Sequence, residues 1–145
     1  MRLILMLMMS LAFNSAHAST EIVRDNGFEI QIQPFPSTFL TQDVAQTYGF
    51  ERSRRQTLLN VVVLTVQPDG QARGAVPATV TGFVRNLLGQ TQTLTFREID
   101  EGEGAIYYLA PVRVASEEEI QIQLEVIPDG APAIDVDFKR RVYVD

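Results

Sequence analysis

The stretch "LLNVVVLTV", residues 58–66, is apolar at almost every position. A strand with one covered face alternates between apolar and polar residues, whereas a strand covered on both faces is apolar almost throughout. Branched side chains such as valine also favour the extended backbone of a strand. The stretch therefore predicts a central β-strand that is buried on both sides.

Six other segments alternate between apolar and polar residues with a period of two. They cover residues 28–33, 76–88, 93–97, 106–114, 120–126 and 134–144. This period is typical of strands with one buried face. The sequence "PDG" follows two of the seven strands, at 68–70 and 128–130, and supplies residues that tight turns favour. Seven short strands without a long helix predict an all-β sandwich.

The segment 34–56 has no period of two and predicts one short helix. Thr41 can cap this helix, Asp43 suits the positive dipole of its first turn, and Gly49 suits its C-terminal end. The apolar side of the helix would pack on the sandwich. This side is formed by Leu40, Val44, Ala45 and Tyr48. We therefore interpret this segment first as a connection between strands.

The N-terminus predicts a secretory signal peptide. Arg2 precedes an apolar run at 3–13, which is too short for a membrane span of about 20 residues, and Ala16-His17-Ala18 is a typical cleavage site. We expect cleavage after Ala18, a single mature domain at residues 19–145, and a soluble periplasmic product without a transmembrane segment.

The remaining 127 residues contain no His, Cys, Met or Trp, and 11 basic side chains face 18 acidic ones, a net charge of 11 − 18 = −7. Nucleic acid is excluded as a partner because its phosphates need clustered positive charge. A Ser-His-Asp triad, a cysteine nucleophile and the usual zinc, copper or haem ligands are also excluded. We expect no cofactor and no metal.

Arg52, Arg54 and Arg55 are the candidate contact residues. Guanidinium groups pair bidentately with carboxylates and phosphates, so the three arginines could receive an anion or a partner. The alternative is a solvated loop whose arginines form local ion pairs with Glu51 or Asp43. We expect the solvated loop and keep the site as a hypothesis to test.

Two acidic clusters also have two interpretations. Asp100, Glu101 and Glu103 could offer oxygen ligands to calcium, but they lack the spacing of a known calcium loop, which favours an acidic hairpin tip. The run 117–119 precedes an apolar strand and could contact a partner. It is more typical of charges that protect a strand from aggregation.

Tyr107 and Tyr108 are neighbours in one predicted strand, so their rings point to opposite faces. One ring is expected in the core. The other could serve a binding face, although cross-strand packing is the favoured interpretation.

Several stretches together resemble a known family: "FPSTFLTQDVAQTYGFERS", "LLNVVVL", "PATVTG", "NLLGQ" and "AIYYLA". They are similar to the secreted family of Gram-negative bacteria catalogued as domain of unknown function 4426, in the same order along nearly all of residues 19–145. The resemblance implies a periplasmic, single-domain, immunoglobulin-like sandwich. Together with the residue patterns above, we expect a seven-stranded antiparallel immunoglobulin-like β-sandwich with one short helix between the first two strands. The resemblance implies no activity and no site residues.

Three functions are consistent with these observations. We favour a non-catalytic binding or accessory module of the cell envelope, not an enzyme, whose protein or envelope partner the sequence does not specify. The second is a small carboxylate-based hydrolase, which would need two carboxylates about 5 to 10 Å apart in one cleft. The third is a structural subunit that associates through an edge strand, which would appear as a long unprotected edge.

Overall fold

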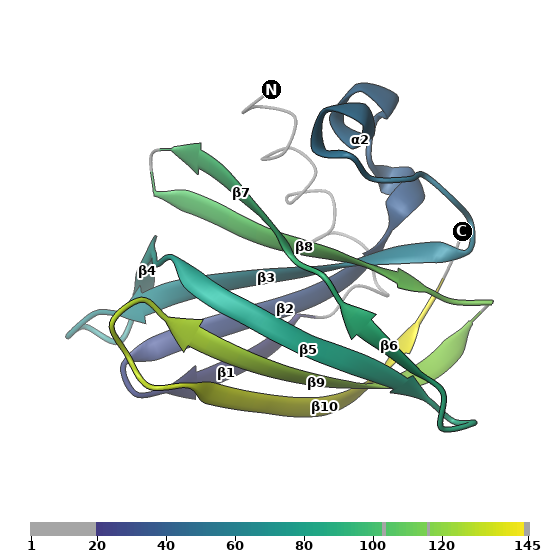
Figure 1. The fold of residues 1–145 in the computed structure, drawn as a ribbon. Coiled ribbons are helices and arrows are strands. Elements are labelled where there is room, and N and C mark those ends of the chain that lie inside the picture. The colour runs from purple at the N-terminus through teal and green to yellow at the C-terminus, as the bar shows by residue number, and fades with distance from the viewer. Residues whose placement is uncertain (1–19, 103, 116, 144–145) are drawn as a thin grey trace.

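The protein folds into two antiparallel sheets packed face to face (Figure 1), as seen in a computed structural model that describes residues 20–102, 104–115 and 117–143. Ten strands make up the sheets: β1 (Glu21–Asp25), β2 (Phe28–Pro36), β3 (Gln56–Val66), β4 (Ala72–Ala75), β5 (Ala78–Asn86), β6 (Thr91–Leu94), β7 (Arg97–Gly102), β8 (Ala105–Arg113), β9 (Glu118–Pro128) and β10 (Ile134–Val142). Two short helices, η1 (Ser37–Phe39) and α2 (Gln42–Tyr48), lie between β2 and β3.

The large sheet has the strand order β1-β2-β3-β8-β7, and the small sheet has the order β10-β9-β5-β6. Strand β3 is central in the large sheet. It pairs with β2 along most of its length, while its other edge is shared between β8, from Gln56 to Val61, and β4, from Leu64 to Val66. All of these pairings are antiparallel.

The apolar positions of the alternating segments meet between the two sheets and form the main core. Strand β9 illustrates this, because Ile120, Ile122, Leu124 and Val126 are buried there. In β3, Leu59, Val61 and Val63 belong to the same core. The period of two thus predicted the buried face of these strands correctly.

A second, smaller core lies on the opposite face of the large sheet. Leu58 and Val62 of β3 are buried there, against Leu40 and Val44 from the segment that carries the two helices. Strand β3 is therefore covered on both faces, as its nearly continuous apolar sequence predicted.

Helix α2 has the ends that the sequence predicted. The Thr41 hydroxyl oxygen accepts a hydrogen bond from the backbone N–H of Val44 at 3.3 Å, and Asp43 lies in the first turn. Gly49 ends the helix in the left-handed conformation, with φ of 75°, which glycine adopts without steric cost.

The predicted all-β sandwich with one short α-helix is confirmed, but the chain forms more strands than the seven expected. β1 and β4, of five and four residues, were not predicted. The predicted strand at 93–97 is divided between β6 and β7, which lie in different sheets. The chain changes sheet at Thr95 and Phe96, although its alternation continues through them.

The predicted signal peptide and its cleavage site lie outside the described residues. In the part of the chain that is described, no helix is long and apolar enough to cross a membrane.

Candidate functional site

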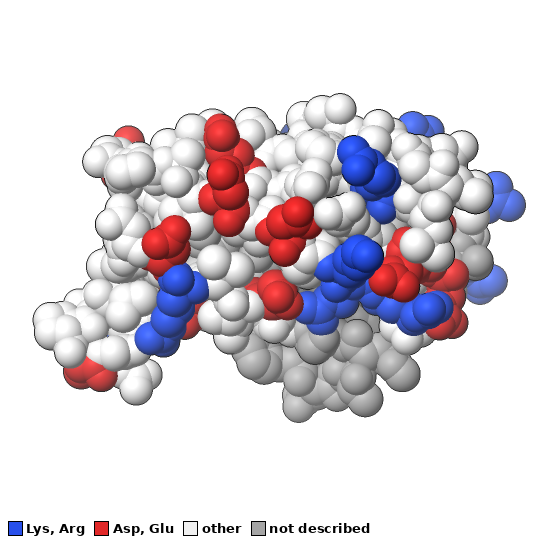
Figure 2. All heavy atoms as spheres, turned by 90° about the horizontal axis from the view of Figure 1, so that it is seen from below, with Lys and Arg blue, Asp and Glu red and all other residues white. Residues whose placement is uncertain are grey.

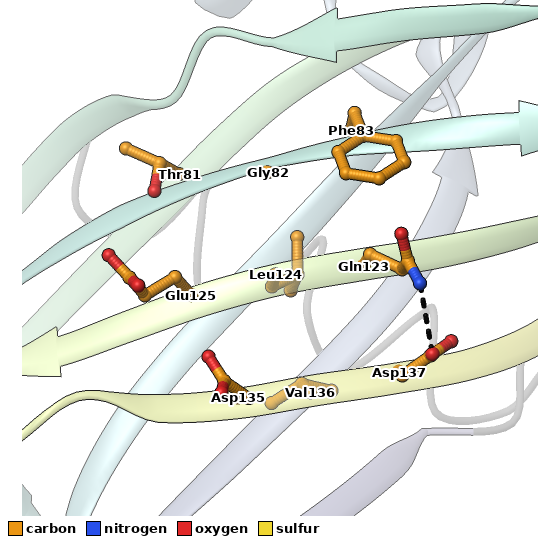
Figure 3. A pocket seen from close by; sticks show the side chains of 9 residues that line it. All are labelled: Thr81, Gly82, Phe83, Gln123, Leu124, Glu125, Asp135, Val136 and Asp137. Atoms are coloured by element: carbon orange, nitrogen blue, oxygen red, sulfur yellow. Dashed lines mark hydrogen bonds between the residues drawn. The ribbon is translucent and has the colours of Figure 1, made fainter.

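A shallow, open groove of about 420 Å³ runs across the outer face of the small sheet. Its floor consists of two cross-strand rows from β5, β9 and β10, which Figure 3 shows side by side. The first row contains Thr81, Glu125 and Asp135, and the second contains Phe83, Gln123 and Asp137. The groove is therefore acidic, with one aromatic ring at its side.

Asp137 is the carboxylate of the groove with the most hydrogen bonds. It accepts bonds from Gln121 Nε2 at 2.9 Å and from Gln123 Nε2 at 3.0 Å. These bonds, first that from Gln123, lower the pKa of Asp137, and the charges of Lys139 and Arg85 add to the effect. A lowered pKa keeps this carboxylate ionised, which is the opposite of what a general acid needs.

The groove does not provide a metal site. Among the residues that the structure describes, no three His, Cys, Asp or Glu side chains come close enough together to hold a metal ion. The groove is open to solvent, so its carboxylates can accept hydrogen bonds or pair with exposed cations, and such pairs contribute little in water.

The three candidate arginines, Arg52, Arg54 and Arg55, are all exposed in the segment that leads from α2 to β3. Arg52 donates a hydrogen bond to the backbone carbonyl of Thr38 at 3.2 Å. The carbonyl of Arg55 accepts the backbone N–H of Val114 at 2.8 Å, which places this segment beside the end of β8.

The segment that carries these arginines is firmly held. The fully buried Ser37 donates from its hydroxyl to the Ser53 carbonyl at 2.8 Å and accepts the Ser53 N–H at 2.9 Å. The segment is thus an anchored connection, as predicted. Whether the arginines also contact a ligand or partner stays a prediction.

Sequence reasoning missed the two large apolar residues that are most exposed in the described part of the chain. Leu87 and Leu88 are 79% and 84% exposed at the turn between β5 and β6. The sequence predicted a turn at 88–90 but assigned no role to its leucines. These two leucines differ from the buried leucines of the protein only in that they belong to neither core. The local sequence pattern does not indicate this difference.

The turn that carries the leucines, residues 86–90, is called the hairpin tip below. It is organised by Asn86, whose Oδ1 accepts the backbone N–H of Leu88 at 3.0 Å and of Gln90 at 2.9 Å. The Asn86 amide also donates to Gln90 Oε1 at 2.8 Å. These bonds fix the backbone of the tip while the leucines stay in solvent.

The hairpin tip and the candidate arginines lie at the same end of the sandwich, at the right in Figure 1. Gln92, just after the tip, donates to the Arg113 carbonyl at 2.7 Å and accepts the Arg113 N–H at 2.8 Å. The next residue, Val114, bonds to Arg55. The structure thus brings exposed Arg55 and Arg113 to the end of the sandwich that carries the two leucines, which the sequence did not indicate.

The other clusters have structural partners. Glu101 accepts a hydrogen bond from the Tyr48 hydroxyl at 3.1 Å, which ties β7 to α2. The N–H of Gly102 donates to Asp100 Oδ1 at 2.8 Å, and Glu103 lies outside the described residues. Glu117 forms an exposed ion pair with Arg141 at 3.1 Å.

The two adjacent tyrosines point to opposite faces, as predicted, and both are buried. Tyr108 lies in the main core and Tyr107 in the smaller core beneath α2. Burial raises the pKa of both hydroxyls. Neither ring forms an exposed binding face, so cross-strand packing is the correct interpretation.

The carboxylate of Glu29 is buried on the outer face of the large sheet. Burial alone would raise the pKa of Glu29, but hydrogen bonds from Gln31 at 2.7 Å and Arg24 at 2.8 Å, and the Arg24 charge, lower it overall. Glu29 is therefore held as an anion in an ion pair.

Two antiparallel sheets with a short helix over one face define a small all-β sandwich protein. The chain belongs to the family described as Domain of unknown function (DUF4426), which it matches over residues 23–145. No curated protein matches the sequence.

Solved structures that resemble the fold include the following three. A DUF4426 family protein from Pseudomonas aeruginosa PAO1 is 31% identical, with a TM-score of 0.74, and the match covers 87% of this chain and 96% of that one. FetP of uropathogenic Escherichia coli strain F11, expressed in the periplasm, is 14% identical, with a TM-score of 0.63 and coverage of 88% and 96%. A copper-bound variant of FetP is 13% identical, with a TM-score of 0.64 and coverage of 89% and 93%.

Proposed function

We propose that this protein is a soluble, non-catalytic binding or accessory module of the periplasm that engages a protein of the cell envelope through its hairpin tip. The observation that carries the proposal is the near-complete exposure of Leu87 and Leu88 on an ordered turn. Scattered apolar residues are common on surfaces, but two adjacent leucines that project from a fixed turn form a small apolar contact surface.

The energetics of the tip favour binding. Full burial of a leucine contributes about 1.5–3 kcal/mol, so a pocket that takes both leucines would gain a few kcal/mol. Because Asn86 already fixes the turn, binding would cost little additional backbone ordering.

The surroundings of the tip carry charges of both signs. Exposed Arg55 and Arg113 lie at the same end of the sandwich, and β9 begins there with Glu118 and Glu119, next to Ile120, which pairs with Asn86. We therefore infer a partner whose apolar pocket takes the two leucines, and we assign no charge to the border of that pocket.

The hydrolase alternative has less support. It requires a carboxyl group that stays protonated near neutral pH beside a second carboxylate. The pKa values of Glu29 and Asp137 are both lowered, and Asp137 lies in an open groove on a sheet face. We therefore propose a function that is not enzymatic.

The copper of the FetP variant does not fit the donor set of this chain. Copper in proteins favours imidazole, thiolate and thioether ligands, and residues 19–145 contain no His, Cys or Met. The proposal for this protein therefore includes no metal.

The periplasmic location rests on the N-terminal sequence, with its short apolar run and Ala16-His17-Ala18. It is consistent with the periplasmic expression of FetP. Mass spectrometry of the native protein should find a mature N-terminus at Ser19. A mature chain that still begins with Met1 would contradict export with cleavage.

The binding function can be tested by crosslinking in cells. A photoreactive amino acid at Leu88 should capture one envelope protein, whereas the same probe at Ile22, an apolar position that is 55% exposed on β1, should not. The double variant Leu87→Ser/Leu88→Ser should stay folded and lose that partner in a pull-down, while Ile22→Ser keeps it. Capture of the same partner by the double variant would overturn the proposal, as would crosslinks at Leu88 to lipid alone.

A further inference from the structure

Strand β10 forms an open edge of the small sheet, since it pairs with β9 alone among the described strands. Figure 1 shows it along the lower side of the sandwich. With nine residues it is longer than the other outer strands, β1, β6 and β7, which have five, four and six. A long open edge presents a row of backbone N–H and C=O groups that another strand can pair with.

The charges of β10 have a regular order. Asp135, Asp137, Lys139 and Arg141 are all exposed and alternate with the inward positions, so they share the outer face of the sheet. The first half of this face is acidic and the second half is basic. Figure 2, which views this side from below, shows acidic side chains mainly at the left and basic ones mainly at the right.

We propose that β10 pairs with β10 of a second copy of this chain, antiparallel and centred on Phe138. In this register Asp135 lies opposite Arg141 of the other copy, and Asp137 lies opposite Lys139. The two-fold axis repeats both pairs, so four complementary pairs form from one strand. The two small sheets, each of four strands, would become one continuous sheet of eight.

The charge order selects this register. A shift by two residues in one direction places Asp137 opposite Asp137, and a shift in the other direction places Lys139 opposite Lys139. Opposite charges that face each other across two strands stabilise the pairing, whereas like charges destabilise it. An edge with charges of one sign would repel its copy, but this edge is complementary to itself, as a two-fold interface requires.

An aromatic residue, Phe138, stands at the centre of the pairing, with the Arg140 guanidinium of the same strand 5.6 Å from the centre of its ring. Phe138 is only half-buried at the sheet edge, where it packs against the main core. In the proposed dimer the two Phe138 side chains lie directly opposite each other, and cross-strand aromatic pairs stabilise sheets.

Contacts within one copy leave this surface available. Arg141 pairs with Glu117 at 3.1 Å, but both side chains are about half exposed, so the pair is weak and can be shared. Arg140 Nη2 instead points inward and binds Glu21 Oε2 of β1 at 2.9 Å. This ion pair joins the two sheets beneath the edge. Asp137 accepts hydrogen bonds from Gln121 and Gln123 of the same copy, and each of its oxygens can accept a further bond from a partner strand.

The proposal is independent of the hairpin tip and can be tested by exchanging charges. The acidic half is reversed in Asp135→Arg/Asp137→Lys, and the basic half in Lys139→Asp/Arg141→Asp. Analytical ultracentrifugation of the purified full-length product should find dimers of the unaltered protein. For each variant alone, the dissociation constant should rise at least about tenfold, which corresponds to about 1.4 kcal/mol.

The decisive sample is an equimolar mixture of the two variants. Every cross-strand pair is complementary again between them, so native mass spectrometry should detect the heterodimer. The variant Asp43→Lys/Glu51→Lys changes net charge as much as the first variant, at exposed positions between β2 and β3, and should dimerise normally.

Three results would overturn the proposal. The unaltered protein could stay monomeric up to about 1 mM. The charge-reversed variants could still form homodimers, or their mixture could fail to form the heterodimer. Circular dichroism establishes that each variant is folded. A heterodimer in the mixture shows in addition that each variant can still pair, so the loss of its homodimer is due to the charges and not to a damaged fold.

Discussion

The hydroxyl of Tyr108 accepts a hydrogen bond from the backbone N–H of Ala78 across 2.8 Å. Tyr108 belongs to β8 of the large sheet, and Ala78 begins β5 of the small sheet. The same hydroxyl donates to Glu98 Oε1 at 2.7 Å. One buried side chain thus links the two sheets through a polar contact at the border of an otherwise apolar core.

Stability should decrease at alkaline pH because of Tyr108. Burial, together with the hydrogen bond to Glu98, raises its pKa to about 12, against about 10 in an unfolded chain. Its contribution is complete below pH 10 and is lost as the pH rises toward 12, a loss of up to about 2–3 kcal/mol.

Urea unfolding followed by circular dichroism between pH 8 and pH 12 measures this effect. Tyr108→Phe should be less stable at pH 8 by about 1–3 kcal/mol, because the Ala78 N–H loses its buried partner. It should also lose less stability above pH 10. An alkaline decrease as steep as in the unaltered protein would argue against the role of Tyr108.

Gly82 should not tolerate a side chain. A Cβ at this position would clash with the carbonyl oxygen of Gln123 and lie 2.8 Å from Leu124 Cδ2, because β5 and β9 approach closely there. We expect Gly82→Ala to reduce the free energy of unfolding by about 1–3 kcal/mol through overpacking. The neighbouring exposed Thr81→Ala should change it by no more than about 0.5 kcal/mol. Equal effects of the two variants would refute this explanation.

The helical segment should contribute to stability through its buried face. Leu40 is 2% exposed in the smaller core, and Leu40→Ala should cost about 2–4 kcal/mol through lost burial and a cavity. The adjacent Phe39 is 42% exposed, so Phe39→Ala should cost less. Chemical denaturation of both variants makes the comparison, and a greater loss in Phe39→Ala would contradict the packing described.

The arginines at 52, 54 and 55 should matter little for folding. Replacement of all three with glutamine should change the free energy of unfolding by no more than about 1 kcal/mol, because the side chains are exposed. We also expect the triple variant to keep its envelope partner in a pull-down. Loss of that partner from a folded variant, with salt-sensitive binding in the unaltered protein, would instead establish these arginines as contacts.

Much of this protein was determined by its local sequence. The period of two identified the buried face of most strands, and the nearly continuous apolar run identified β3 as covered on both sides. Thr41 and Gly49 defined the ends of the helix because capping depends on neighbours a few residues away. The absence of His, Cys and Met from residues 19–145 excluded whole classes of chemistry without any structure.

Other features were decided only by the tertiary structure. A period of two reports which side chains are covered but not which strands are neighbours, so it could not separate β6 from β7 or place β10 at an edge. Leu87 and Leu88 resemble core residues in the sequence, and their exposure follows from the position of the turn beyond both sheets. The order of charges on β10 was visible from the start, but it became a candidate interface only once the strand was found to have one neighbour, β9, among the described strands. Pairing depends on contacts between residues far apart in the chain, which a local pattern does not report.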